Sequence, residues 1–231
     1  MIRLHVIGEG QSEVRFVKKV LSSHLSNRQV YPDARAVFTG YDKKLHKPYR
    51  GGFIGKHPYQ KAKKDITDWL KQDKSKDCRF TTMFDLYALP EDFPGHSTSR
   101  DIADIYQKVE HIELELANDI NDPRFIPYIQ LHEFETLLYS DLTILKMEYL
   151  QYERQINHMI TNMNGINPET INESPITAPS KRLIKIIPEY EFDKATVGPL
   201  LLELIGLDVM RKKCRHFNDW VTTLESLNNV T

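Results

Sequence analysis

Short apolar runs alternate with helical periodicity through the first 140 residues. Residues 2–7 have the apolar content of a buried strand. The apolar residues from Val14 to Leu25 then recur at every third or fourth position, as on one face of an amphipathic helix. The same alternation predicts strands at 30–39, 80–84 and 125–131 and helices at 59–70 and 102–120. Four strands separated by helices predict an α/β fold with a mainly parallel four-stranded sheet flanked by helices.

Two segments of this first part lack apolar periodicity and are predicted to be loops, at 40–57 and 86–96. One of the hydroxyl residues at 97–99 is expected to cap the helix that follows. Pro127 predicts a bulge or an edge position for the fourth strand, because proline cannot donate a hydrogen bond to a sheet.

Beyond residue 141 the strand signals fade and helical segments follow one another. After a helical turn at 132–139, they are predicted at 142–163, 181–187, 197–205 and 217–227. We therefore expect an α/β domain at 1–140 and a helical C-terminal region at 141–231. The pattern leaves open whether this region packs on the sheet.

The composition indicates a globular protein without a general affinity for polyanions. The chain has 231 residues, of which 40% are hydrophobic, and this is enough for a sizeable core. The formal net charge of −1 excludes a globally basic nucleic-acid binder, so any such contact must be local. Cys78 and Cys214 suggest no disulfide framework, and no apolar run or targeting segment indicates a membrane or an export route. We expect a soluble, cytoplasmic protein whose oligomeric state the sequence leaves open.

The most specific motif is the segment 8–13, which reads GEGQSE and joins the first strand to the first helix. Its glycines allow a sharp turn, which leaves Glu9 at the carboxyl end of the strand, where open α/β sheets bind ligands. Glu13, in the first helical turn, is expected to face the same edge. Two such carboxylates repel each other unless one is protonated or a cation lies between them. For Glu13, stabilisation of the helix start is the structural alternative.

Three further acids are predicted at the same edge of the sheet. Asp85 ends the third strand, and Glu133 and Glu135 follow the fourth. Glu9, Glu13 and Asp85 would supply the hard oxygen ligands that Mg²⁺ or Mn²⁺ prefers, and Glu133 or Glu135 could ligate a second ion. A zinc site is not expected from this spacing. The structural alternatives are a turn at Asp85 and a stabilised helix start at the two later glutamates.

A basic segment follows the second strand and gives the neutral chain a local positive charge. Between positions 41 and 64, one acid, Asp42, stands against Lys43, Lys44, Lys47, Arg50, Lys56, Lys61, Lys63 and Lys64. The interleaved aromatic residues and glycines would let such a loop fold over a phosphate backbone and stack on exposed bases. A solvated surface is the alternative.

Two features have weaker support. Lys181 lies at the entry of a helix after a proline, and a lysine brought to a metal site could stabilise charge that develops on a phosphate. An exposed lysine at a helix start is the alternative. Cys214 with His216 has too few partners for a zinc site, and these two residues and His132 are interpreted as structural.

The segment 8–13 resembles the first motif of Toprim-type domains, which occur in topoisomerases, primases and the overcoming-lysogenization-defect nucleases. Its second acid, Glu13, is similar to the nuclease branch. Across nearly the whole chain, the sequence resembles an uncharacterised bacterial family, the domain of unknown function 4276, at TTMFDLY (81–87), IQLHEFE (129–135) and TAPSKRL (177–183).

This resemblance implies a Toprim-like parallel sheet with an α-helical C-terminal extension and a divalent metal at Glu9, Glu13 and Asp85. It also implies an ATPase partner in defence against phage, and Lys181 loosely matches a lysine that nuclease members bring to the site. One position departs from the pattern. Toprim domains commonly carry a second aspartate two residues after the one that corresponds to Asp85. In this chain that position is Tyr87.

The leading prediction is an Mg²⁺-dependent nuclease in which Glu9, Glu13 and Asp85 hold the ion. Its substrate would be gripped by the basic loop, at Lys43, Lys44, Lys47, Arg50 and Lys56. The alternative is a non-enzymatic Toprim-like partner or sensor subunit that docks an ATPase through its helical tail, which Tyr87 favours. A third hypothesis, phosphoryl transfer on a small nucleotide, would need a closed pocket.

Overall fold

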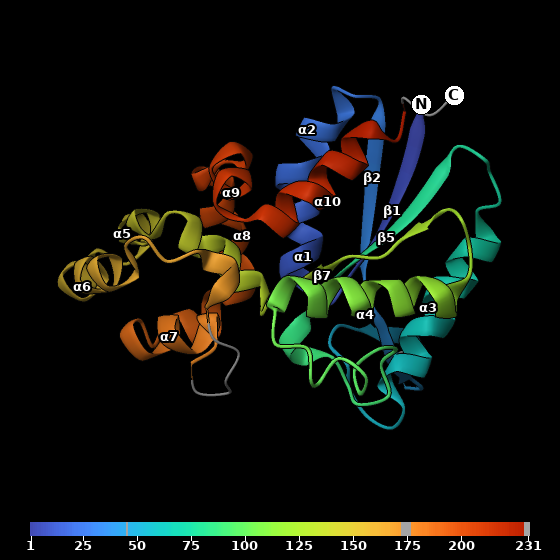
Figure 1. The fold of residues 1–231 in the computed structure, drawn as a ribbon, viewed down its shortest axis with the longest axis horizontal. Helices are drawn as coiled ribbons and strands as arrows, with labels where there is room; N and C mark the ends of the chain where they lie inside the picture. The colour runs from blue at the N-terminus through green and yellow to red at the C-terminus, as the bar shows by residue number, and fades with distance from the viewer. Residues whose placement is uncertain (45, 172–176, 229–231) are drawn as a thin grey trace.

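The computed structural model describes residues 1–44, 46–171 and 177–228 (Figure 1). Its centre is a mostly parallel sheet with the strand order β2-β1-β5-β6, and β7 pairs with the end of β5. The predicted α/β fold with a mainly parallel sheet is confirmed. The strands of this sheet are β1 (Ile2–Gly8), β2 (Val30–Ala36), β5 (Cys78–Asp85), β6 (Phe125–Ile126) and β7 (Ile129–Gln130).

The fourth predicted strand, at 125–131, is split in two. Pro127 and Tyr128 separate β6 from β7, and both pieces pair with β5 in parallel. Because proline has no N–H to donate, it interrupts the ladder at this point. β6 is the last strand in the sheet order, so the edge position predicted from Pro127 is confirmed.

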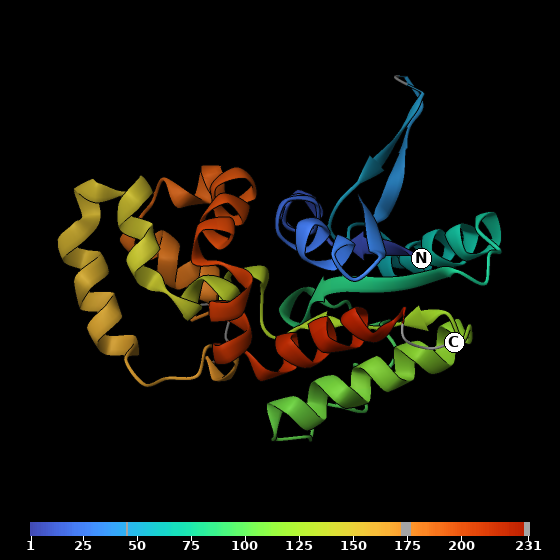
Figure 2. The ribbon, with the colours of Figure 1, turned by 90° about the horizontal axis from the view of Figure 1, so that it is seen from above.

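Helices cover both faces of the sheet, over two buried apolar clusters. Leu4 and Val6 of β1 face one cluster, whereas Ile7 faces the other, as the alternation of a strand requires. A nearly continuous helical stretch, as predicted from Val14 to Leu25, packs on the first cluster. It consists of α1 (Gln11–Phe16), a π-helical segment (Val17–Leu21) and α2 (Ser22–Ser26). The second cluster is covered by α3 (Pro58–Gln72) and α4 (Ile105–Ile120) (Figures 1 and 2).

Residues 40–57, predicted to be a loop, contain part of an antiparallel hairpin. β3 (Phe38–Asp42) pairs with β4 (Lys47–Arg50), and the two strands project from the body of the protein (Figure 2). The prediction was wrong because the hairpin buries no apolar face. The hydrophobic alternation that identifies a half-buried strand is therefore missing. The predicted strand at 30–39 is divided accordingly between β2 and β3.

The start of α4 also differs from the prediction. Asp104 caps this helix, because its side chain accepts hydrogen bonds from two backbone N–H groups of the first turn, at 3.0 and 2.9 Å. The expected cap among residues 97–99 is wrong. Ser99 N–H instead donates to Gly95 O (2.9 Å) within a separate turn.

The chain beyond residue 141 is helical, as predicted, and none of the described helices has both the length and the apolar composition of a membrane span. The single helix predicted at 142–163 is interrupted at Tyr149, where the backbone leaves the helical region (φ −124°, ψ 51°). The helices are α5 (Leu145–Glu148), α6 (Glu153–Met163), α7 (Pro179–Ile186), α8 (Tyr190–Ile205), α9 (Leu207–Lys213) and α10 (Arg215–Ser226). Short 3₁₀ turns lie at Leu86–Ala88, Phe134–Ser140, Leu142–Ile144, Leu150–Tyr152 and Pro168–Thr170.

The last helix, α10, returns to the sheet. Trp220 donates from Nε1 to Thr81 Oγ1 of β5 (3.0 Å) and stacks on Tyr128, with ring centroids 4.1 Å apart. Apolar residues of β1 and of the C-terminal helices belong to one buried cluster. The helical region therefore packs on the sheet, and a domain boundary at residue 140 stays a prediction.

A buried carboxylate fixes the start of α10. Glu169 is fully buried and accepts hydrogen bonds from the N–H groups of His216 and Phe217, each at 3.0 Å. Tyr106 Oη donates a third hydrogen bond to it (3.1 Å). An anion at a helix N-terminus is favoured by the free N–H groups and the dipole, so Glu169 links α4 to the last helix.

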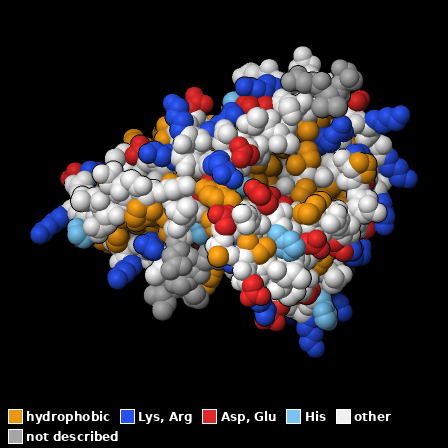
Figure 3. Space-filling view, viewed as in Figure 1, with side chains coloured by type: hydrophobic (Ala, Val, Ile, Leu, Met, Phe, Trp, Pro, Cys, Tyr) orange, Lys and Arg blue, Asp and Glu red, His pale blue; other side chains and the backbone are white. Residues whose placement is uncertain are grey.

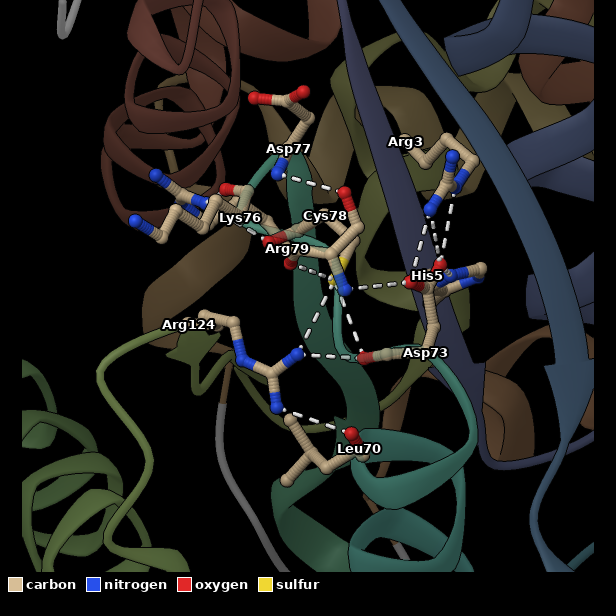
Figure 4. A network of polar contacts seen from close by, with 10 residues as sticks. Arg3, His5, Leu70, Asp73, Lys76, Asp77, Cys78, Arg79 and Arg124 are labelled. Carbon is tan, nitrogen blue, oxygen red and sulfur yellow. Dashed lines mark hydrogen bonds and ion pairs between the residues drawn. The ribbon is translucent and has the colours of Figure 1, made fainter.

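A polar network joins the amino ends of the strands (Figure 4). Asp73 accepts a hydrogen bond from Arg3 Nη2 (2.8 Å) and lies 3.0 Å from His5 Nε2. Arg124 Nη1 donates to the backbone oxygen of Asp73 (2.6 Å). The hydrogen bond with His5, helped by a backbone N–H and by Arg3, lowers the pKa of Asp73 below its usual range. The acid at this edge thus has partners that stabilise its charge.

We expect Trp220→Ala to lower the free energy of unfolding by about 3–5 kcal/mol, because it leaves a cavity between α10 and the sheet. Urea denaturation followed by circular dichroism measures the change. Leu114→Ala is the control, since Leu114 is 58% exposed on α4 and should cost less than about 0.5 kcal/mol. Equal losses in the two variants would contradict the packing of α10 on the sheet.

Candidate functional site

Strand pairing brings Glu9 and Asp85 together. β1 and β5 are parallel neighbours with Gly8 opposite Met83, so the ends of both strands emerge at one edge. The N–H of Glu9 donates to Met83 O (2.9 Å), and the N–H of Asp85 donates to Glu9 Oε2 (3.2 Å). The two acids that the sequence places at the carboxyl ends of separate strands are therefore in contact.

The turn between β1 and α1 holds Glu13 over the same edge. Glu13 is 4% exposed, and its Oε2 accepts a hydrogen bond from Gly10 N–H (2.6 Å). This close packing requires glycine at position 8, because a Cβ there would lie 2.7 Å from the Cβ of Glu13. Glu13 therefore stabilises the helix start and lies beside Glu9 at the same time.

The segment after β7 adds Glu135 to this group. Glu135 is 5% exposed, and Tyr190 Oη donates a hydrogen bond to it (3.4 Å). Glu133 is turned instead to the start of α7, where it accepts a hydrogen bond from Ser180 N–H (2.8 Å). Of the two glutamates predicted as extra ligands, Glu135 thus belongs to the acidic group and Glu133 lies at its border.

Burial and repulsion raise the pKa values of the acidic cluster, which we define as Glu9, Glu13, Asp85 and Glu135. Burial, followed by repulsion from Glu13, raises the pKa of Glu9 to about 8. Burial also raises the pKa of Glu13, and it raises that of Glu135 to about 7. Burial and then repulsion from Glu9 raise the pKa of Asp85 well above its usual range. Without a cation, the cluster therefore retains protons near neutral pH.

One oxygen of the acidic cluster lacks a hydrogen bond. Asp85 Oδ1 is buried and has no partner among the described residues. Such an acceptor costs about 1–3 kcal/mol when it is left unsatisfied. Its environment therefore favours either a proton on Asp85 or a bound cation.

Lys194 on α8 is a positive charge that acts on the acidic cluster. It lowers the pKa values of Glu9, Glu13 and Glu135 and so opposes the effect of burial. The packing of α8 on α1 brings it there, since Arg15 Nη1 of α1 donates to the backbone oxygen next to Lys194 (2.7 Å). The sequence analysis missed Lys194, because no motif surrounds it.

Lys181 does not take this position. It is exposed in the first turn of α7, and among the described residues no hydrogen bond or ion pair joins it to the acidic cluster. The start of α7 presents the backbone N–H of Ser180 to Glu133, and the side chain of Lys181 is not used there. The structure thus agrees with the alternative of an exposed lysine at a helix start.

The basic residues between positions 41 and 64 fall into two groups. Lys43, Lys44, Lys47 and Lys56 are exposed. The others form contacts within the protein: Arg50 with Asp65, Lys61 with the carbonyl groups of Thr39 and Ile54, Lys63 with Asp119, and Lys64 with Asp68. On the face shown in Figure 3, Lys and Arg side chains are dispersed among acidic and apolar ones.

The residues interpreted as structural have structural contacts. His132 Nε2 lies 2.9 Å from Glu169 O, and burial lowers the pKa of His132 to about 4, so it is neutral at pH 7. His216 Nε2 lies 2.9 Å from Glu113 Oε1. Cys214 is buried, and burial raises the pKa of its thiol to about 12.

Within the described residues, no three acidic, histidine or cysteine side chains already converge as a metal-binding group. The physical reason is that Glu9 and Glu13 are each turned to a backbone N–H, of Asp85 and Gly10 respectively. The donor chemistry still fits a hard divalent cation, because the cluster offers carboxylate oxygens and one of them, Asp85 Oδ1, is unsatisfied.

Comparison with family models gives a match over most of the chain. The model described as a domain of unknown function (DUF4276) matches residues 8–225. No curated protein and no solved structure matches. The matched region contains every residue of the acidic cluster.

The raised pKa values predict how the stability of the metal-free protein depends on pH. A folded Glu9 with a pKa of about 8 binds a proton that the unfolded chain, near 4.5, releases. Its contribution is therefore fully present below about pH 4.5 and is lost as the pH rises to about 8. We expect the Tm in EDTA to fall by several degrees across this window, at about 2–4 °C per kcal/mol.

Glu9→Gln should flatten this dependence, because it removes one of the titrating groups. Differential scanning calorimetry of both proteins at several pH values measures the effect. Glu191→Gln, at an exposed carboxylate of α8, is the matched control. Parallel curves for Glu9→Gln and the unmodified protein would show that the acidic cluster is not the source.

Proposed function

The chain belongs to the DUF4276 family, a domain of unknown function, and from its acidic cluster we propose that it is a divalent-metal-dependent nuclease that hydrolyses phosphodiester bonds of nucleic acids. The observation that carries the proposal is Asp85 Oδ1, a buried acceptor without a hydrogen bond in the described residues, among three other acids. A cation at this point would satisfy that atom and relieve the repulsion at once.

Glu9, Glu13 and Asp85 would hold Mg²⁺ or Mn²⁺, with Glu135 as a fourth carboxylate. A bound ion of this kind polarises phosphoryl oxygens and makes a coordinated water more acidic. Glu9 and Glu13 would exchange their backbone N–H partners for it. Because Tyr87 occupies the position of the second Toprim aspartate, a two-metal site would depend on Glu135.

In this proposal, Lys194 supplies the positive charge that would act on the phosphate of the substrate. An ammonium group near the cluster stabilises the negative charge that develops on a phosphate during hydrolysis. It also favours the ionised carboxylates, since it lowers the pKa values of three of them. The resemblance to overcoming-lysogenization-defect nucleases extends the proposal to phage defence with an ATPase partner.

We expect Glu9→Gln and Asp85→Asn each to reduce Mn²⁺-dependent cleavage of labelled DNA or RNA by at least about 100-fold, because each removes a group that acts in the reaction. Gel electrophoresis measures cleavage, and isothermal titration calorimetry measures Mn²⁺ binding. Glu191→Gln controls for the loss of one negative charge. Unchanged cleavage in either cluster variant, or no Mn²⁺ binding by the unmodified protein, would overturn the assignment.

Lys194→Gln is expected to lower the cleavage rate about tenfold or more, as the loss of a charge-stabilising donor does in other enzymes. It should also move the acidic limb of the pH–rate profile to higher pH, because the carboxylates lose the charge that lowers their pKa values. Lys181→Gln removes an equal charge from α7 and should change neither quantity. Equal effects of the two variants would contradict the assignment of Lys194.

The second candidate function is the non-enzymatic subunit that docks an ATPase. One observation favours it: α8 exposes apolar side chains, with Phe192 85% exposed and Leu204 49% exposed. Cation binding separates the two functions. A docking subunit would keep the acidic cluster protonated and would bind neither Mg²⁺ nor Mn²⁺ in a calorimetric titration.

A further inference from the structure

The hairpin of β3 and β4 has the form of a projecting two-stranded ribbon. Tyr41 pairs with Pro48, Gly40 pairs with Tyr49, and the ribbon extends away from the sheet and helices (Figure 2). From Tyr41 to Tyr49, every side chain that the structure describes is exposed. At about 3.4 Å per residue, its five-residue strand reaches roughly 17 Å. The ribbon adds no residue to either buried apolar cluster, so its role is not to build the core.

The ribbon carries positive charge on a chain whose formal net charge is −1. Lys43 and Lys47 are exposed near its tip, and Lys56 is exposed in the segment that follows it. Lys47 and Tyr49 are two residues apart on β4 and so lie on the same face. An ammonium group and an aromatic ring on one face of a projecting strand suit contact with phosphates and with the edges of bases.

The base of the ribbon is held rigidly. Asp65 of α3 is 8% exposed and pairs with Arg50 (2.9 Å) and Arg35 (2.8 Å), and it accepts a hydrogen bond from Phe38 N–H (3.1 Å). Lys61 Nζ donates to the backbone of β3 (3.1 Å). A two-stranded hairpin is marginally stable by itself, so these contacts give the ribbon a fixed direction. Arg50 is therefore a positioning residue.

The base of the ribbon also contacts the backbone of Glu9, a member of the acidic cluster. Gly52 N–H donates to the backbone oxygen of Glu9 (2.8 Å), and Gly51 N–H donates to Val37 O (2.8 Å). Gly51 has a φ of +117°, which favours glycine, and lies close to the turn that carries Glu9. Whatever the ribbon holds is thus held at a set position relative to Glu9.

We propose that this ribbon enters the major groove of duplex DNA and fixes the duplex over the acidic cluster; the inference rests on the nuclease function proposed above. The major groove of B-form DNA is about 12 Å wide and admits a two-stranded β-ribbon. The major groove of an A-form RNA duplex is deep and narrow and excludes one. A binder of single strands would instead track the backbone along a groove. The ribbon projects into solvent, which suits insertion into a duplex.

Fluorescence anisotropy in EDTA tests the proposal without cleavage. The probes are a DNA duplex of about 30 base pairs, roughly three turns, an RNA duplex of the same sequence and the single DNA strand. We expect the DNA duplex to bind most tightly. Lys43→Gln/Lys47→Gln should weaken its binding about tenfold and reduce the salt slope by about 2, at roughly 0.9 per phosphate contact.

Lys212→Gln/Lys213→Gln is the matched control, since it removes the same charge from exposed positions of α9. It should leave the affinity for the DNA duplex nearly unchanged. Equal losses in the two double variants would overturn the proposal, because they would report net charge alone. Equal or tighter binding of the RNA duplex or of the single strand would overturn it as well.

Chemical footprinting with dimethyl sulfate identifies the groove. We expect protection of guanine N7, which lies in the major groove, and loss of this protection with Lys43→Gln/Lys47→Gln. Protection confined to adenine N3, in the minor groove, would overturn the proposal. Protection that persists in the ribbon variant would do the same.

Cleavage of the same duplex with Mn²⁺ separates failure of this proposal from failure of the nuclease function. Ribbon-dependent binding without cleavage by the unmodified protein would overturn the nuclease and support the ribbon as a duplex binder. Cleavage by Lys43→Gln/Lys47→Gln at the normal rate and substrate concentration would overturn the ribbon and leave the nuclease in place.

Discussion

The burial of several carboxylates at one edge of the sheet, with little positive charge beside them, is the constraint on which the site depends. Each unit by which a pKa is displaced represents about 1.4 kcal/mol of unfavourable interaction with the charged form. The opposite edge shows the contrasting case: His5, Arg3 and a backbone N–H lower the pKa of Asp73 there. The half-buried carboxylate of Asp73 is thus surrounded by partners, whereas the buried Oδ1 of Asp85 has none among the described residues. An arrangement that costs stability in the metal-free protein is expected where a function needs it.

The site is assembled from parts of the chain that are far apart in sequence. β1 and β5 provide Glu9 and Asp85, the segment after β7 provides Glu135, and α8 provides Lys194. The C-terminal helices are therefore part of the site as well as a cover for the sheet. Their position is fixed by buried contacts, such as those of Trp220 with Thr81 and of Glu169 with the start of α10. A change in these contacts would move Lys194 relative to the acids.

The parts of the structure that could be predicted from the sequence are those that bury an apolar surface. β1, β5 and α3 have clear hydrophobic periodicity, and the rule that ligands bind at the carboxyl ends of parallel strands then places Glu9 and Asp85 together. The β3–β4 ribbon was missed because its exposed strands have no such pattern. Arg50 was predicted to contact nucleic acid, yet its side chain pairs with Asp65. Only the tertiary fold brings these two residues together. Lys194 was missed, and Lys181 was preferred, because the distance of an exposed lysine from the cluster depends on how the helices pack.

The acidic cluster is negative when ionised and the ribbon is positive, so the two act in opposite directions on a bound nucleic acid. This difference sets the order of the binding steps at the site. An acidic cluster repels a polyanion, whereas the exposed lysines of the ribbon attract one. The base of the ribbon contacts the turn that carries Glu9. The repulsion by the cluster and the attraction by the ribbon would therefore act on the same stretch of a bound duplex. While the cluster is ionised and holds no cation, the part of the duplex nearest to Glu9 is repelled. Neutralisation of the carboxylates, by a cation or by protons, removes that repulsion and lets the ribbon bring a phosphate to the acids. Only the cation both neutralises the cluster and supplies a Lewis acid, so the proposed hydrolysis requires the cation even where protons have already removed the repulsion.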